Sequence, residues 1–269
     1  MRVKSGLPVS SARSLINSLA AEGRYHFTSA DARTALGVSA AAAKLAVNRL
    51  AKQGLVASPA RGFYVIVPPE YRRLGCLPAD QFIPALMERL RLRYYAGLLS
   101  AAQYYGAAHH RPQAFQVVLA RNRRPLACGA VRVLFIARKR IGDVPVRSFN
   151  TPRGTVFVST VEATAIDLVG YQDHAGGLDL VATVLSELAD QIDPQRLVAA
   201  AETAPLPWSQ RLGYLLELVG GADKAAALKE YVGDKARAAT FLLPAGPPRK
   251  VRRAADWKLY INAEVEPEA

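Results

Sequence analysis

The sequence predicts an α+β fold, in which a small helical module ending in a hairpin precedes a larger mixed α+β domain. Two observations support this division. Helical periodicity, turn residues and two short strands follow one another up to residue 67, and strand-like runs between residues 115 and 159 are followed by further helical periodicity. The 269 residues are enough for one or two domains. We expect domains at residues 1–69 and 81–269, joined by a linker at residues 70–80.

The first two helices are indicated by caps and by apolar spacing. A helix is predicted over residues 10–21, and a short extended link then leads to Thr28. Thr28 can cap a second helix over residues 29–36, with Asp31 three positions later as a variant of the capping box. Gly37 ends this helix, because glycine tolerates the left-handed conformation common after a helix.

A third helix, over residues 40–53 and capped by Ser39, is the element best suited to enter a DNA groove. Its apolar residues recur on one face and should pack inward, whereas the opposite face is polar or small. Asn48 can hydrogen-bond an adenine edge, and Lys44 can reach a guanine or a phosphate. The inward residues are Ala43, Ala46, Val47 and Leu50, and the outward residues are Ala41, Lys44, Leu45, Asn48 and Lys52, with Arg49 beside them.

A hairpin is predicted directly after the third helix. Its strands are expected at residues 55–58 and 63–67, with a turn at residues 59–62. Arg61 at the tip is placed to contact phosphate or to enter the minor groove. This order is that of a winged helix-turn-helix, which places one helix in the major groove of DNA. The predicted DNA-binding residues of this module are Thr28, Ser39, Ala41, Lys44, Asn48, Arg49, Lys52, Arg61 and Gly62.

The charge is strongly positive and unevenly distributed. The net charge is +13, of which residues 1–73 carry +8. Residues 89–142 contain 11 Lys and Arg and no carboxylate, whereas residues 143–269 have a net charge of −4. A polyanionic partner is therefore expected on the first half of the chain and a different role on the second half. The alternative is a basic protein whose charge serves only its solubility.

Two basic runs fall between predicted strands of the larger domain, at residues 121–125 and 138–140. We expect both to lie on loops, where they can contact phosphates beside the winged helix and enlarge its footprint. Arg123 and Arg124 are the principal candidates. An RNA contact and an acidic protein partner are the alternatives. The basic residues of the two runs are Arg121, Arg123, Arg124, Arg138, Lys139 and Arg140.

The remaining elements are expected to support the fold. The tyrosines of a helix at residues 94–105 should pack in the core rather than stack on bases. Glu162 and Asp167 lie five positions apart in a helix at residues 161–171, so they do not share a face, and we expect capping and surface or interface roles for them. Strands are also predicted at residues 115–120, 131–136, 144–149, 155–159, 241–243 and 257–261, and helices at residues 81–90, 177–188, 194–201, 205–221 (capped by Ser209) and 224–231.

No motif for catalysis, cofactor binding or metal binding is visible. The phosphate-binding pattern G-x-x-x-x-G-K-[ST] and clustered acids are absent, which disfavours a nuclease or nucleotidyltransferase fused to a DNA reader. Cys76 and Cys128 have neither metal-like nor redox-like spacing, and the pair His109–His110 has no neighbouring ligand. No apolar run approaches the ~18 residues that span a bilayer. We therefore expect a cytoplasmic protein without membrane contact.

Several segments follow one another along nearly the whole chain: FTSADARTALGVS, LAVNRLAKQGLV, RGFYVI, YYAGLLSAAQYYG, VSTVEATAIDLV, SQRLGYLLELVGG and WKLYIN. Together they resemble the AbiEi-type antitoxins of bacterial type IV toxin–antitoxin systems. The resemblance implies that the winged helix binds inverted repeats in its own promoter and represses the operon. It further implies that the larger domain counteracts a cognate nucleotidyltransferase-type toxin, directly or indirectly, without catalysis of its own.

Two points stay open at the level of sequence. A helix that reads a palindrome implies two copies on the DNA, either as a dimer or as monomers that meet only there. The alternative function is a ligand-responsive winged-helix regulator without a toxin partner, for which a pocket in the larger domain would argue.

Overall fold

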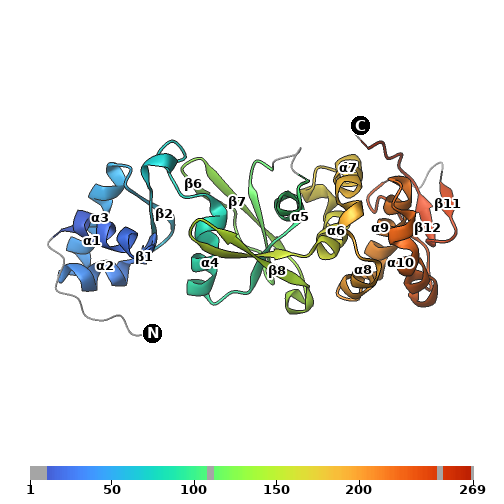
Figure 1. Ribbon diagram of the computed structural model, residues 1–269, viewed down its shortest axis with the longest axis horizontal. Helices are drawn as coiled ribbons and strands as arrows, with labels where there is room; N and C mark the ends of the chain where they lie inside the picture. Colours follow the sequence, from blue (N-terminus) through green and yellow to red (C-terminus); the bar gives the residue numbers. More distant parts are fainter. Residues whose placement is uncertain (1–10, 108–111, 247–250, 268–269) are drawn as a thin grey trace.

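The computed structural model describes residues 11–107, 112–246 and 251–267. It confirms the α+β fold, with an N-terminal winged helix followed by a larger mixed part. Figure 1 shows an elongated molecule in which the winged helix, a central β-sheet and a C-terminal group of helices follow one another along the long axis. None of the helices in the described ranges is long and apolar enough to cross a membrane.

The winged helix contains the three expected helices and a sheet with one more strand than expected. Residues 26–28, expected as a link, pair with the second strand of the hairpin, for example His26 opposite Val65. The sheet is antiparallel in the order β1-β3-β2. The elements are α1 (Ala12–Ala21), β1 (His26–Thr28), α2 (Ser29–Leu36), α3 (Ala40–Lys52), β2 (Val56–Ala60) and β3 (Phe63–Ile66).

The wing turn is tighter than the sequence suggested. β2 extends to Ala60, so only Arg61 and Gly62 separate the two strands, and Gly62 has a φ of 68°. A two-residue hairpin turn commonly requires such positive φ, which favours glycine. Pro59 is accommodated inside β2 because the strand register shifts between Ala57 and Ala60, and proline is tolerated where the ladder is interrupted.

The segment expected as a linker at residues 70–80 is packed against its neighbours. A short 3-10 helix at Pro69–Tyr71 begins it, and the side chains of Cys76 and Leu77 are buried. Both belong to an apolar cluster that also contains Phe63 and Val65 of the wing. The winged helix and the central sheet are thus joined by a common core. The domain boundaries at residues 69 and 81 stay a prediction.

The central sheet has six strands in the order β6-β7-β5-β4-β9-β8. The pairs β5–β7 and β4–β9 are parallel, and the other neighbours are antiparallel. Apolar side chains project from both faces of the sheet, because successive residues of a strand point to opposite sides. The strands are β4 (Tyr94–Ala96), β5 (Phe115–Leu119), β6 (Leu126–Cys128), β7 (Val131–Ala137), β8 (Val146–Thr151) and β9 (Gly154–Ser159).

Each face of the sheet has its own core. Val117 and Leu119 of β5 point toward α4 (Ala79–Leu90) and the wing, where they pack with Phe82. Val118, between them, points to the opposite face and joins the core formed with the C-terminal helices. The sheet is therefore the layer that connects the winged helix to the helical part of the chain.

The helix expected over residues 94–105 is wrong in its first half. Tyr94–Ala96 form β4, which fills the position between β5 and β9. The chain does not pass directly from β4 into a helix, because Gly97 is extended (φ −128°, ψ −179°) and Leu98 has a φ of 51°. The helix α5 covers only Leu98–Ala102 and leads into a 3-10 turn at Gln103–Tyr105. Core packing is confirmed for Tyr95 and Tyr105, which are both buried.

The C-terminal part consists of helices and a small three-stranded sheet in the order β10-β12-β11. Ser209 is not a cap, as expected from the sequence, but is buried inside α9, which begins after Pro205. Arg252 lies in a strand of this sheet, and residues 247–250 before it fall outside the described ranges. The elements are α6 (Val161–Gly170), α7 (Leu178–Leu188), α8 (Pro194–Ala201), α9 (Leu206–Leu218), α10 (Ala222–Lys235), β10 (Thr240–Phe241), β11 (Arg252–Ala254) and β12 (Leu259–Ile261).

The shared core predicts that damage to the wing destabilises the whole chain. Phe63→Ala removes an aromatic side chain that is 1% exposed and should lower the free energy of unfolding by ~3–5 kcal/mol. Leu218→Ala, at a position that is 42% exposed, is the control and should change it by less than ~0.5 kcal/mol. Urea unfolding followed by circular dichroism measures both. Equal midpoints for the two variants would contradict the shared core.

Candidate nucleic-acid interface

The helix α3 has the two faces that the sequence predicted. Ala43, Val47 and Leu50 are 3%, 1% and 5% exposed and pack under the helix, and Ala46 is half-buried. The opposite face is open, and Leu45 on it is 59% exposed. The exposed residues there are Ala41, Lys44, Leu45, Asn48, Arg49 and Lys52.

Two of the predicted contact residues act as helix caps. The Thr28 hydroxyl accepts from the Asp31 backbone N–H at 3.1 Å, and the Asp31 carboxylate accepts from the Thr28 backbone N–H at 2.8 Å. The same carboxylate binds the Arg24 guanidinium at 2.8 Å, so Arg24 is neutralised locally. The exposed Ser39 side chain accepts from the Ala42 N–H at 3.2 Å. These caps fix the start of α2 and of α3, and helix starts are favourable places for a phosphate.

A basic hollow lies between α3, the wing tip and α4. Its lining includes Lys44, Arg61 and Arg89, and its volume is about 520 Å³. A Cβ at Gly62 would lie 3.2 Å from the Ser29 hydroxyl and 3.4 Å from the Arg89 guanidinium, so these groups adjoin the wing tip. Lys44, Arg61 and Arg89 come from three separate elements and converge on one surface. They can therefore hold an anion such as a DNA phosphate.

Arg89 is the residue of this hollow that the sequence did not single out. It stands in the last turn of α4, outside the winged helix. The available signal was the long run without carboxylates that begins at residue 89. Sequence order alone gave no reason to place this side chain beside the wing.

Arg123 and Arg124 lie on the loop between β5 and β6, as expected. Arg124 is exposed, whereas Arg123 is half-buried with its guanidinium 5.5 Å from the centre of the Phe135 ring. Strand β6, which follows this loop, packs beside β2 of the wing.

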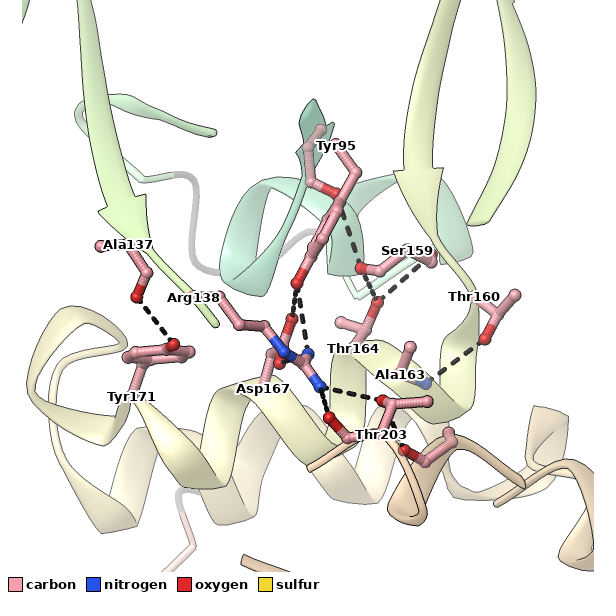
Figure 2. A network of polar contacts seen from close by, with 12 residues as sticks. Tyr95, Ala137, Arg138, Ser159, Thr160, Ala163, Thr164, Asp167, Tyr171 and Thr203 are labelled. Atoms are coloured by element: carbon pink, nitrogen blue, oxygen red, sulfur yellow. Dashed lines mark hydrogen bonds and ion pairs between the residues drawn. The ribbon is translucent and has the colours of Figure 1, made fainter. Parts of the chain in front are cut away.

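Arg138, expected on a phosphate-binding loop, is instead buried. Its side chain is 3% exposed and forms an ion pair with Asp167, which is 0% exposed. Figure 2 shows the guanidinium between Tyr95, Asp167 and Thr203. It donates to the Tyr95 hydroxyl at 3.2 Å and to the Thr203 hydroxyl and carbonyl oxygens at 3.0 and 3.2 Å. Arg138 is therefore unavailable to DNA.

The other two residues of that run stay at the surface. Lys139 is exposed, and Arg140 pairs with Asp143 at 3.0 Å in an exposed ion pair. Nothing in the sequence distinguished the three residues. Of the three, Lys139 alone is exposed and has no ion pair with another described residue.

The carboxylates of α6 are also buried, which corrects the expected surface and interface roles. Asp167 accepts from the Tyr95 hydroxyl at 2.7 Å in addition to its pairing with Arg138. Burial raises the pKa of Asp167 to about 6, against the lowering effect of Arg138 and of the Tyr95 hydrogen bond. Glu162 is 4% exposed and accepts from the Asp193 backbone N–H at 3.3 Å, which ties α6 to the start of α8.

This polar network connects the sheet to the helices. Tyr95 belongs to β4, Arg138 follows β7, Asp167 lies on α6, and Thr203 follows α8. The Tyr171 hydroxyl adds a bond to the Ala137 carbonyl at 2.9 Å, as Figure 2 shows. Both terminal nitrogens of the Arg138 guanidinium are bound by protein groups, so we assign the network a structural role that holds the helices on the sheet.

The described residues contain no group of three or more His, Cys, Asp or Glu side chains that could hold a metal ion. Cys76 and Cys128 are free, buried thiols. His109 and His110 lie outside the described ranges.

Two family models match the chain. The model described as "AbiEi antitoxin C-terminal domain" matches residues 95–218, and "Transcriptional regulator, AbiEi antitoxin" matches residues 14–67. The chain belongs to the AbiEi family. The first match includes Tyr95, Arg138, Asp167 and Thr203, and the second includes α2, α3 and the wing. The general role of this AbiEi protein is accordingly that of an antitoxin and transcriptional regulator.

A solved structure has the same fold along nearly the whole chain. The crystal structure of the RV2827C protein from Mycobacterium tuberculosis matches with a TM-score of 0.67 and 18% sequence identity. The match covers 96% of this chain and 92% of that protein. None of the curated proteins matches this AbiEi chain.

The buried ion pair predicts a large loss of stability when one partner is removed. Asp167→Ala leaves the Arg138 charge buried without its counter-ion and should lower the free energy of unfolding by ~3–5 kcal/mol. The double variant Arg138→Met, Asp167→Ala should cost less than the sum of the single variants Arg138→Met and Asp167→Ala, because it leaves no buried charge. Chemical denaturation of the three variants measures the coupling, and additive costs would refute it.

Proposed function

We propose that this AbiEi protein represses its own operon by binding inverted repeats in its promoter, and that it is the antitoxin of a nucleotidyltransferase-type toxin. It acts in the cytoplasm, needs no cofactor and carries out no reaction of its own. The observation that carries this proposal is the combination of an exposed polar α3 face on a winged helix with the AbiEi antitoxin match at residues 95–218.

The α3 face supports sequence-specific DNA binding. Lys44 and Asn48 are exposed on successive turns, and Asn48 can form two hydrogen bonds to an adenine edge. The first turn of α3 consists of alanines, so the helix can approach the groove floor closely. Leu45 is apolar and 59% exposed on this face, which suits contact with a thymine methyl group.

Cations around α3 support binding to the DNA backbone. Arg61 at the wing tip and Arg89 of α4 flank the same hollow as Lys44. We include Thr28, Ser39, Ala41, Arg49, Lys52 and Gly62 in the proposed interface, with Arg123 and Arg124 as an extension of it. Phosphate contacts of this kind position a protein on DNA without reading sequence. Two copies, one on each half of the inverted repeat, follow from the symmetry of such an operator.

The C-terminal part has the charge of a different kind of surface. Residues 143–269 have a net charge of −4. Exposed carboxylates are distributed over it, including Asp190, Glu202 and Asp223. A surface of this sign is unfavourable next to DNA, which supports its use for a non-DNA partner. We place the toxin-directed function there, by direct contact or through a shared target.

Two measurements on the full chain test the two halves of the proposal. Fluorescence anisotropy should show tighter binding to a duplex from upstream of the gene than to a random duplex at the same salt concentration. Co-expression with the cognate toxin should restore the growth of cells that this toxin inhibits. Equal affinities would overturn specific repression. Failure to restore growth would overturn the antitoxin role and leave the alternative of a regulator without a toxin.

Asn48→Ala tests base recognition. If Asn48 reads an adenine, its loss should cost ~1–3 kcal/mol on the operator and much less on random duplex. Competition binding at fixed salt gives both values. A uniform loss on all sequences would assign Asn48 to the phosphate backbone instead.

Charge reversal of Arg123 and Arg124 tests the extended footprint. The slope of log affinity against log salt is negative, and each lost phosphate contact should reduce its magnitude by about 0.9. Arg237→Glu, at an exposed position after α10, makes the same change of charge as one of these two reversals; it is the control and should leave the slope unchanged. If the double variant keeps the original slope as well, these arginines do not contact phosphate.

A further inference from the structure

We propose that a cavity between the winged helix and the central sheet binds a small aromatic anion, and that this ligand is coupled to DNA binding. The cavity has a volume of about 610 Å³ and lies beside β1, α4 and the strands β4, β8 and β9. This volume is within the range of small-molecule sites. The site is separate from the basic hollow at α3, and it goes beyond the proposed function.

Three apolar side chains that line the cavity are exposed, although the protein has large cores in which apolar side chains are buried. Leu92, Val146 and Phe157 are 37%, 42% and 46% exposed, and all three line this one cavity. The Phe157 ring meets the Tyr94 ring edge to face, with 6.1 Å between their centres. Exposed apolar groups collected in a concave site mark a binding surface more often than isolated ones do. An aromatic ring is the ligand group that such a pair of rings accommodates best.

The charge of the lining favours a negative ligand. Glu88 is the one carboxylate among the lining residues, and two guanidinium groups, those of Arg93 and Arg153, accompany it. Arg153 is already bound to Glu70 at 3.0 Å and lies 3.4 Å above the centre of the Tyr25 ring. Arg93, in contrast, has no carboxylate partner among the described residues. Arg93 can therefore bind a carboxylate or sulfonate by charge-assisted hydrogen bonds.

Some residues of the lining carry a buried polar atom without a hydrogen-bond partner among the described residues. The Arg153 Nε and the Gln81 Oε1 are buried and have no hydrogen-bond partner, and both residues line the cavity. Burial and the nearby Arg24 lower the pKa of His26, so its ring is neutral at pH 7 and adds no charge. Hydrogen-bonding groups placed around an apolar centre are typical of sites that orient one ligand.

The position of the cavity gives the physical basis for the proposed coupling between ligand binding and DNA binding. His26 belongs to β1 of the winged helix, and Arg153 contacts Tyr25 just before that strand, whereas Arg93 and Phe157 belong to the central sheet region. A ligand that contacts both the winged helix and the central sheet stabilises the arrangement in which these two parts lie this close together. It changes DNA affinity to the extent that free and DNA-bound protein differ in this arrangement.

The probe that tests the site is 1-anilinonaphthalene-8-sulfonate, an aromatic anion whose fluorescence rises in apolar surroundings. Titration of the full chain should give saturable binding at one site. Phe157→Ala and Arg93→Gln should each weaken it by about five- to tenfold. The controls are Leu218→Ala and Arg237→Gln, which remove an exposed apolar and an exposed basic side chain elsewhere and should leave it unchanged.

The charge and the coupling need their own measurements. The uncharged analogue N-phenyl-1-naphthylamine should bind the original protein more weakly, and Arg93→Gln should not weaken its binding further. Saturating sulfonate probe should change the affinity for duplex DNA by about fivefold or more. Circular dichroism confirms that each variant is folded. Absence of saturable binding, or binding insensitive to both variants, would overturn the site; unchanged DNA affinity would overturn the coupling.

Discussion

The buried ion pair between Arg138 and Asp167 is the constraint around which the larger part of the molecule is arranged. Removing an arginine guanidinium from water costs its hydration, which hydrogen bonds and an opposite charge must replace. Here a carboxylate, a tyrosine and a threonine provide them. These groups come from the sheet, from α6 and from the segment after α8. The pair is therefore satisfied only when the sheet and the helices are docked in one orientation. It specifies how the helical part is mounted on the sheet.

The basic residues of this AbiEi protein illustrate how burial decides the use of a charge. Arg138 and Lys139 are adjacent in the sequence, yet one is 3% exposed and the other lies at the surface. Arg24 and Arg153 are engaged by Asp31 and Glu70. Lys44, Arg61 and Arg89 converge on one hollow beside α3. None of these three cations forms an ion pair within the described residues, so they are available to an anion in a way that the net charge of the chain does not indicate.

Local signals made the winged helix predictable from the sequence. The caps at Thr28 and Ser39 and the apolar spacing of α3 act over three to four residues, and each of these elements forms where those signals lie. The strand β4 was missed because Tyr94–Ala96 take their conformation from neighbours at residues 117–119 and 158. The burial of Arg138 was missed for the same reason, since its partner Asp167 is 29 positions away. Periodicity carries no information about contacts at such separations.

The common core of the wing and the central sheet restricts how the winged helix of this chain can be exchanged. Phe63 and Val65 pack with residues of α4 and β5, whereas the interior of the winged helix is a separate cluster that includes Phe27 and Val47. Recombination that exchanged residues 14–67 for those of a relative would also replace Ala57, Phe63, Val65 and Val67 of this core, and a poor fit would expose apolar surface. Under the proposed function, operator specificity changes more readily through substitutions on the outer face of α3, where Lys44 and Asn48 are exposed and outside this core, than through exchange of whole modules.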